Sequence, residues 1–243
     1  MVQFVFLHGG GQGGWVWDET IAAIDRQSGG AARCLALDGP GCGAKRGRQT
    51  DALSFAQINR ELVADIEEAG LRDVVLVGHS QAGGHLPAMA ELRPDLFRRL
   101  VFVSCIAPDP GLTVVEMTAR RMREHGHTPG SMALTDEARP MRERYRVMFC
   151  NDMEAPQAER FLDKLGSDQW PPACYSQSEW RYDHLAAVPV SYVVCLEDAI
   201  LPCEWQRRFA ERVHAGRVVR IDAGHQVMNT RPQALAEVLL AEA

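Results

Sequence analysis

Several features of membrane, secreted and nucleic-acid-binding proteins are missing from this sequence of 243 residues. No apolar run approaches the roughly 18 to 20 residues that cross a bilayer. The opening residues, MVQFVFLHGG, lack the basic segment and long apolar stretch of a signal peptide. Lys and Arg number 26 against 32 Asp and Glu, so a broad basic face is not expected. We therefore expect no membrane and no nucleic acid among its partners.

The sequence also gives little indication of disulfides, a zinc site or a nucleotide-binding site. The seven cysteines are an odd number without a C-x-x-C pair, which argues against a disulfide framework and a zinc-finger spacing. We interpret them as reduced, mostly buried thiols and expect a cytoplasmic location. The glycine-rich stretch at 9–14 has no convincing G-x-G-x-x-G register, and the Lys-Ser/Thr pair of a phosphate-binding loop is absent. Nucleotide binding is therefore disfavoured.

What the sequence does contain is an alternation of short β-type runs and amphipathic stretches. The runs lie at 3–7, 34–37, 74–77, 100–104, 190–196 and 218–221. The stretches at 51–70 and 204–216 have helical periodicity, with Gly70 and Gly216 where these helices should stop. This alternation predicts an α/β fold, with a mostly parallel sheet of about six strands and helices on both faces.

One interval departs from the alternation. The residues from 105 to 189 contain no convincing strand, whereas connections in such folds usually take about 2–6 residues. We expect a helical cap inserted after the fourth strand at 108–186, over the carboxyl edge of the sheet. The core domain would then consist of 1–107 and 187–243.

The stretch DVVLVGHSQAGG at 73–84 places Ser80 where a strand should turn into a helix. Gly78 and the small residues after Ser80 permit a sharp turn that lifts a serine hydroxyl above the sheet edge. The helix N-terminus would favour negative charge at the same place. The motif departs from G-x-S-x-G because its fifth residue is Ala82. Ser80 can therefore be a nucleophile or a helix N-cap, a common role of serine.

A nucleophilic serine requires a base and an orienting acid. His225 lies in the loop after the last strand, and Asp198 follows the preceding strand. Glu197 and Asp222 are the alternative acids. The order Ser80, Asp198, His225 is the nucleophile–acid–histidine order of one serine-hydrolase architecture.

Backbone N–H groups would supply the oxyanion site. Gly10, in the glycine-rich loop after the first strand, and Gln81, directly after the serine, are the expected donors. His79 is expected to pack beneath the turn without a catalytic role. No cofactor and no metal is required, because His125 and His127 have no third ligand at a sensible position.

Four stretches of the chain resemble the α/β-hydrolase superfamily, and within it the plant-type branch of methyl-ester esterases and hydroxynitrile lyases. These are FVFLHGGGQGGWVW, VVLVGHSQAGG, YVVCLEDAILPCEWQRRF and GHQVMNTRPQALAEVL. The resemblance implies that Ser80, His225 and Asp198 form a catalytic triad, with Gly10 and Gln81 as its oxyanion donors.

The resemblance also separates two chemistries. The lyases of this branch carry threonine after the first-strand histidine and lysine after the catalytic histidine, where this chain has Gly9 and Gln226. Without the lysine, no ammonium group would stabilise a departing cyanide. We therefore expect a serine hydrolase that cleaves a small, aromatic ester, carbamate or lactone through an acyl-enzyme.

The substrate is expected to be a small molecule. Gly9 and the cap residues Trp170, Tyr175 and Trp180 are its expected contacts. The chain would act as a monomer or a homodimer. Three alternatives stay open: a hydroxynitrile lyase, another non-hydrolytic enzyme of the same fold, such as an oxygenase without a cofactor, and a catalytically slow ligand-binding receptor.

Overall fold

A parallel sheet of six strands forms the centre of the computed structural model, which describes residues 1–165 and 168–243. The order across the sheet is β2-β1-β3-β4-β5-β6, and every neighbouring pair is parallel. The predicted fold class is therefore confirmed. The strands are β1 (Val2–Leu7), β2 (Ala32–Leu37), β3 (Val74–His79), β4 (Phe97–Val103), β5 (Val190–Cys195) and β6 (Arg217–Ile221).

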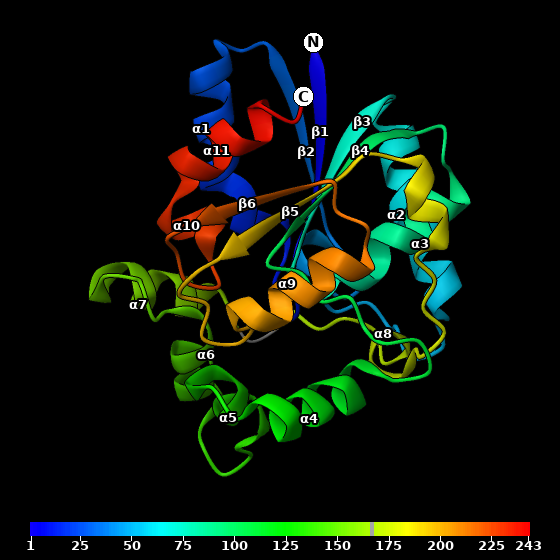
Figure 1. Cartoon of the computed structure of the whole chain (residues 1–243). Coiled ribbons are helices and arrows are strands. Elements are labelled where there is room, and N and C mark those ends of the chain that lie inside the picture. Colours follow the sequence, from blue (N-terminus) through cyan, green and yellow to red (C-terminus); the bar gives the residue numbers. More distant parts are fainter. Residues whose placement is uncertain (166–167) are drawn as a thin grey trace.

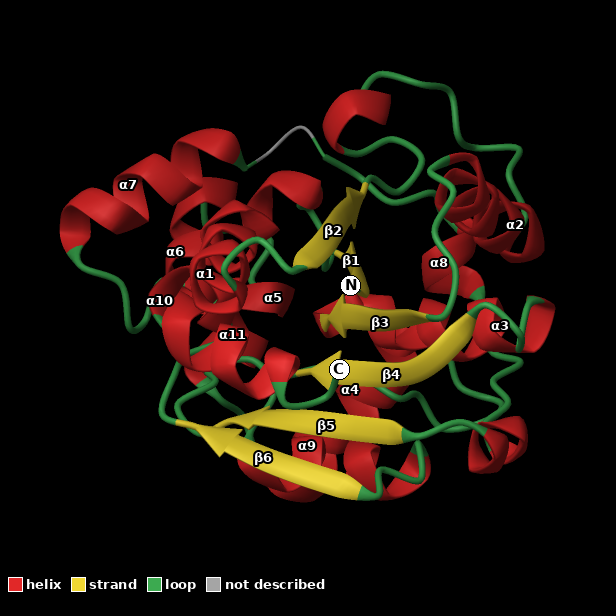
Figure 2. Ribbon diagram, turned by 90° about the horizontal axis from the view of Figure 1, so that it is seen from above, coloured by secondary structure: helices red, strands yellow, loops and turns green. Residues whose placement is uncertain are grey.

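Helices cover both faces of the sheet, as predicted (Figures 1 and 2). On one face, α1 (Asp18–Ser28) and α11 (Pro232–Leu240) pack together. On the other lie α2 (Phe55–Glu68), α3 (His85–Leu92) and α9 (Cys203–Arg212). None of the helices in the described ranges has the length and apolar character of a membrane span. The shorter elements are η1 (Gly14–Trp17), η2 (Gly43–Lys45), η3 (Ser80–Gly84), η4 (Asp183–Ala187) and α10 (Val227–Thr230).

The two predicted helices are shorter in the structure than in the sequence pattern. Helix α2 begins at Phe55 because Ser54 and Gln57 form a capping box, and Gly70 takes a left-handed φ of 68° just after its end. Helix α9 already ends at Arg212, and the left-handed φ near this end belongs to His214. The prediction that Gly216 stops this helix was therefore wrong.

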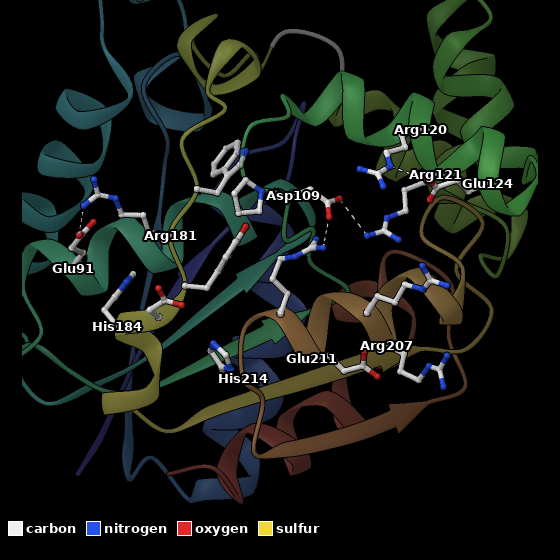
Figure 3. Close-up of a pocket in the computed structure, with 16 residues that line it drawn as sticks. Glu91, Asp109, Arg120, Arg121, Glu124, Arg181, His184, Arg207, Glu211 and His214 are labelled. Atoms are coloured by element: carbon white, nitrogen blue, oxygen red, sulfur yellow. Dashed lines mark hydrogen bonds and ion pairs between the residues drawn. The ribbon is translucent and has the colours of Figure 1, made fainter.

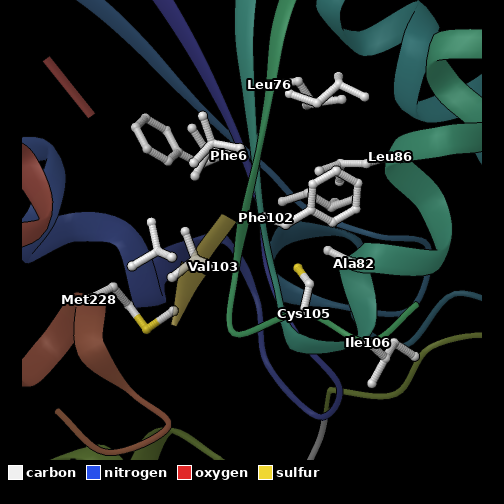
Figure 4. Close-up of a cluster of buried hydrophobic side chains, with 14 of the residues drawn as sticks. Phe6, Leu76, Ala82, Leu86, Phe102, Val103, Cys105, Ile106 and Met228 are labelled. Carbon is white, nitrogen blue, oxygen red and sulfur yellow. The ribbon is translucent and has the colours of Figure 1, made fainter. Parts of the chain in front are cut away.

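The core lies between the sheet and its helices. Figure 4 shows Phe102 and Leu86 on one side of the central strands and Phe6 and Met228 on the other. All four side chains are completely buried. Each burial stabilises the fold by roughly 1.5–3 kcal/mol. Because helices cover both faces, the central strands are apolar on both sides, which explains their near-continuous hydrophobic runs.

Between β4 and β5 the described residues form helices and loops without a strand. These helices lie at the end of the sheet where the strands finish (Figure 1). The predicted helical insertion after the fourth strand is therefore confirmed, whereas the division into a core of 1–107 and 187–243 and a cap of 108–186 remains a proposal. The inserted helices are α4 (Val114–His125), α5 (Pro129–Thr135), α6 (Met141–Phe149), α7 (Ala155–Lys164) and α8 (Ala173–Ser176).

A buried histidine should make the fold sensitive to acid. His85 stacks on Trp170 and its Nδ1 lies 2.9 Å from Asn59 Oδ1. Burial lowers the pKa of His85 to about 3. The unfolded chain protonates this side chain near 6.5, so the stability that depends on neutral His85 is lost as the pH falls from 6.5 towards 3.

We expect His85→Gln to reduce the loss of unfolding free energy between pH 7 and pH 5 by about 2 kcal/mol. Urea unfolding at the two pH values measures this difference. His127→Gln is the matched control, because His127 is exposed. An unchanged pH dependence in His85→Gln would show that the buried histidine is not the acid-sensitive group.

Candidate active site

Ser80 is the first residue of η3 and directly follows β3. The strand continues to His79, so the serine follows it directly, and its φ of 55° lies in the left-handed region that a residue with a Cβ rarely adopts. The N-cap position of η3 is His79, and no side chain caps this turn. The Ser80 hydroxyl instead lies 2.9 Å from His225 Nε2. The interpretation of Ser80 as a helix N-cap is therefore wrong.

Small residues make this turn possible. A Cβ at Gly78 would lie 2.5 Å from Leu86 Cδ1, and one at Gly83 would lie 2.0 Å from the Ile106 carbonyl oxygen. Position 83 therefore requires glycine, because the backbone carbonyl cannot move away easily, whereas a side chain at position 78 would force Leu86 to shift. Ala82 is completely buried among core side chains, where its methyl group fits (Figure 4). The departure from G-x-S-x-G thus leaves the turn intact.

The structure brings three of the predicted residues into one line. His225 Nδ1 lies 2.6 Å from Asp198 Oδ2, and its Nε2 faces the Ser80 hydroxyl. His225 is completely buried, and Asp198 is 8% exposed. A neutral imidazole that donates from Nδ1 to the carboxylate keeps the lone pair of Nε2 for the serine proton. This arrangement can move a proton from the serine to the imidazole.

Asp198 is held in place by further hydrogen bonds. The backbone N–H groups of Ile200 and Leu201 donate to its Oδ1 over 2.7 and 2.8 Å. The hydroxyl of Ser104, just after β4, donates to its Oδ2. An ionised carboxylate accepts all of these bonds, so they orient it towards the imidazole. Ser104 was missed by sequence reasoning, since only the folded sheet places the end of β4 beside Asp198.

The two alternative acids lie elsewhere. The side chains of Glu197 and Asp222 are exposed, and within the described residues neither carboxylate forms a hydrogen bond or ion pair with His225. Asp198 is therefore the acid that the geometry favours.

Two residues of the inserted segment hold the loops that carry the acid and the base. Asn151 Nδ2 donates to the Glu197 carbonyl oxygen over 2.8 Å. The Gly224 N–H donates to Asp152 Oδ2 over 2.8 Å, and a Cβ at Gly224 would lie 2.4 Å from Asp152 Oδ1. The insertion thus fixes the backbone immediately before Asp198 and His225. No local sequence signal marks Asn151 or Asp152 for this role.

His79 packs beneath the turn. Its Nε2 donates to the backbone carbonyl oxygen of His225 over 2.9 Å, and the two ring centroids are 4.5 Å apart. Burial, followed by the neighbouring His225, holds the pKa of His79 well below its ordinary value, so the ring stays neutral. His79 can therefore hold the backbone of His225 without competing for its proton.

The two expected oxyanion donors lie on adjacent segments. Gln81 is the second residue of η3, directly after Ser80, and the first N–H groups of a helical turn have no acceptor inside it. A Cβ at Gly10 would lie 2.6 Å from Gln81 Oε1, so the glycine-rich loop after β1 approaches this turn closely. Ser80, Gly10 and Gln81 are all partly exposed, which makes this the accessible side of the nucleophile.

Comparison with known proteins agrees with this fold. The profile of a family described as the alpha/beta hydrolase family matches residues 4–238. The chain belongs to the alpha/beta hydrolase family. The predicted resemblance, including that to plant methylesterases, is confirmed: Methylesterase 2 of Arabidopsis thaliana is 24% identical, with 98% of this chain and 94% of that protein covered.

Other relatives of this alpha/beta hydrolase carry esterase names. Polyneuridine aldehyde esterase of Rauvolfia serpentina is 25% identical over 98% of this chain and 94% of its own. A carbendazim hydrolyzing esterase of a Nocardioides species is 27% identical over 99% of both chains. The crystal structure of polyneuridine aldehyde esterase superposes with a TM-score of 0.78 at 22% identity, covering 100% of this chain and 99% of that one. At this identity the structural likeness shows the fold alone.

Trp170 and Gly9, two of the expected substrate contacts, lie in the interior of this alpha/beta hydrolase. Trp170 is completely buried, stacks on His85, and donates from Nε1 to the Gly9 carbonyl oxygen over 3.1 Å. Gly9 itself is buried, and a Cβ there would lie 3.0 Å from both Ser80 Cβ and His79 Nδ1. Trp170 therefore attaches the insertion to the core, and Gly9 allows close packing under the nucleophile. We correct the expectation that these residues contact substrate.

The remaining two cap residues differ from each other. Trp180 is 7% exposed, and its Nε1 donates to the Leu112 carbonyl oxygen over 2.8 Å. Its ring packs against Gly84, at the far end of η3 from the serine, so we correct its expected substrate contact as well. Tyr175 is partly exposed, and its hydroxyl oxygen would lie 4.0 Å from a Cβ at Gly10. Of the expected cap contacts, only Tyr175 stays a proposal.

A surface groove of about 1300 Å³ is lined in part by Trp180 and lies away from Ser80, Asp198 and His225. None of the residues proposed for catalysis lines it. Figure 3 shows that its charged side chains pair with one another: Arg120 with Glu124, Arg181 with Glu91, and Arg121 with Asp109. We assign no role in the reaction to this groove, because its charges largely neutralise each other.

Proposed function

We propose that this chain is a serine hydrolase that cleaves a small ester, carbamate or lactone through an acyl-enzyme on Ser80. One observation carries the proposal: the line from the Ser80 hydroxyl through His225 to the buried Asp198, with distances of 2.9 and 2.6 Å. A serine in a left-handed turn directly after a strand supports the same role.

In the proposed mechanism, His225 takes the Ser80 proton while the serine oxygen attacks the carbonyl carbon. The backbone N–H groups of Gly10 and Gln81 stabilise the oxyanion that forms, a contribution of about 2.7–4 kcal/mol for a single donor in a comparable site. His225 then protonates the leaving alcohol or amine. Water repeats the sequence on the acyl-enzyme, and Asp198 keeps the imidazole oriented throughout.

The names of the relatives support the substrate class. They include the polyneuridine aldehyde and carbendazim esterases described above, and a pyrethroid hydrolase of Sphingobium wenxiniae that is 24% identical over 98% of this chain and 86% of its own. We extend to this chain only what these names share, which is cleavage of a small acyl compound. An aromatic group next to the scissile bond, a cytoplasmic location and a monomeric or homodimeric state belong to the same proposal.

Lyase chemistry on the same scaffold is the alternative that needs a direct test. Gln226 is buried beside the proposed base and carries no charge, so a departing cyanide anion would lack a cation there. The loss of one charge-assisted contact lowers a rate by about one to two decades.

We expect the purified protein to hydrolyse p-nitrophenyl acetate, a carbamate or a lactone faster than it cleaves mandelonitrile. Release of p-nitrophenol, acid and benzaldehyde under one set of conditions measures all of these reactions. If mandelonitrile is cleaved faster than every acyl substrate, the hydrolase proposal is wrong and the protein is a lyase. Substrate binding without any turnover would instead favour the ligand-binding receptor.

A further inference from the structure

The chain has four tyrosines, which fall into two pairs. The hydroxyl of Tyr182 donates to the Pro108 carbonyl oxygen over 2.9 Å, and that of Tyr192 donates to the Cys105 carbonyl oxygen over 2.5 Å. Both side chains are buried. Their hydroxyls satisfy backbone acceptors, as is usual for tyrosine in a protein core. This pair stabilises the fold and has no other assignment.

The second pair belongs to the insertion and reaches the glycine-rich loop beside the nucleophile. A Cβ at Gly11 would lie 3.4 Å from the Tyr145 hydroxyl oxygen. The Tyr175 hydroxyl oxygen would lie 4.0 Å and Gln81 Oε1 would lie 2.6 Å from a Cβ at Gly10, so both side chains approach this loop. Tyr145, Tyr175 and Gln81 are all partly exposed, and in the described ranges no backbone carbonyl accepts from either hydroxyl.

These three side chains leave hydrogen-bonding capacity unused. Burial raises the pKa of Tyr175 to about 12 and also raises that of Tyr145, so both phenols keep their protons at neutral pH. Gln81 Nε2 is buried and has no partner among the described residues. A buried donor without a partner costs about 1–3 kcal/mol. The Tyr145 hydroxyl and the Gln81 amide can therefore each donate a hydrogen bond to a bound molecule.

We propose that Tyr145, Tyr175 and Gln81 form a polar wall that selects substrates with a second hydrogen-bond acceptor beside the scissile carbonyl. This inference rests on the proposed hydrolase function and specifies its substrate class. A ketone, an ether or a ring nitrogen on the substrate satisfies the donors of the wall, whereas a hydrocarbon at the same place leaves them unpaired. A site that hydrogen-bonds a substrate group discriminates strongly against an analogue that lacks it.

Two pairs of matched substrates test the wall and identify which part of the substrate meets it. p-Nitrophenyl levulinate and p-nitrophenyl valerate differ by one ketone oxygen in the acyl group. Methoxyethyl benzoate and butyl benzoate differ by one ether oxygen in the alcohol. The measured quantity is the ratio of kcat/KM within each pair, because intrinsic reactivity cancels when variants are compared with the wild type.

We expect Tyr145→Phe, Tyr175→Phe and Gln81→Met each to lower this ratio by roughly five- to tenfold in one of the two pairs, the equivalent of one hydrogen bond. Tyr182→Phe and Tyr192→Phe are matched controls that should leave both ratios unchanged. A fall of the ratio in one pair supports the wall and shows whether it contacts the acyl group or the alcohol of the substrate. Ratios that stay constant in both pairs overturn it.

Binding separates this inference from the proposed function. Ser80→Ala should bind levulinate or methoxyethyl esters more tightly than their hydrocarbon partners, and Tyr145→Phe in the same background should abolish the difference. Equal binding of both members of each pair by Ser80→Ala would refute the wall. Absence of hydrolysis by the wild type, with the binding preference intact, would refute the hydrolase function alone.

Discussion

Replacement of Ser80 by alanine should lower kcat on every acyl substrate by about 10⁶, the order found when the nucleophile of a serine triad is removed. The change deletes the only atom that can attack the carbonyl carbon in the proposed mechanism. It should leave the fold intact, because Ser80 is partly exposed and its hydroxyl caps no helix. Steady-state and single-turnover kinetics on one ester measure the effect.

Two controls make this result specific to the nucleophile. The circular dichroism spectrum and melting temperature of Ser80→Ala should match or exceed those of the wild type, since alanine also has a Cβ and the variant keeps the left-handed turn. A serine-directed sulfonyl fluoride should add one covalent group at Ser80 in the wild type and none in the variant. Labelling at another residue with activity retained would refute the assignment.

Asp198→Asn should lower kcat by about 10⁴, as the same substitution does in a serine-protease triad. With its oxygen facing the N–H groups of Ile200 and Leu201, the asparagine amide presents its NH2 group to His225 Nδ1. It therefore donates where the carboxylate accepted, and the imidazole takes the wrong tautomer for a base at Nε2. The N–H groups of Ile200 and Leu201 still find an oxygen at Oδ1, so the loop should keep its conformation. Kinetics on the same ester measure the loss.

Glu197→Gln is the matched control, because it changes a neighbouring carboxylate whose side chain is exposed. Its kcat should remain within a few-fold of the wild type, consistent with the small energies of exposed charges. A large loss in Glu197→Gln together with a small loss in Asp198→Asn would transfer the orienting role to Glu197 and leave the fold unaffected.

Much of the proposed site could be predicted from the sequence because its signals are local. The turn at Ser80 needs a strand, small residues and a helix start within about a dozen positions, and these requirements appear as a contiguous pattern. Asp198 and His225 each follow a strand of a parallel sheet. The carboxyl ends of such strands meet at one edge, so their order along the chain was enough to expect them together.

The roles of the inserted residues could not be predicted in the same way. A tryptophan in a cap can line a pocket or pack against the core. The sequence alone does not distinguish these two roles. Only the folded chain showed that Trp170 donates to the Gly9 carbonyl oxygen and that Trp180 donates to that of Leu112. Helix ends were similarly uncertain, since a positive φ at His214 has no glycine to mark it.

The sequence by itself determined the parallel sheet and the helical insertion and indicated the proposed serine, histidine and acid, because periodicity and short motifs encode these features over short distances. The tertiary structure decided which side chains support them. Ser104, Asn151 and Asp152 reach the acid and base loops from segments more than forty residues away in the chain. Such contacts depend on how the insertion packs on the sheet edge, and packing between distant segments leaves no periodic trace in the sequence.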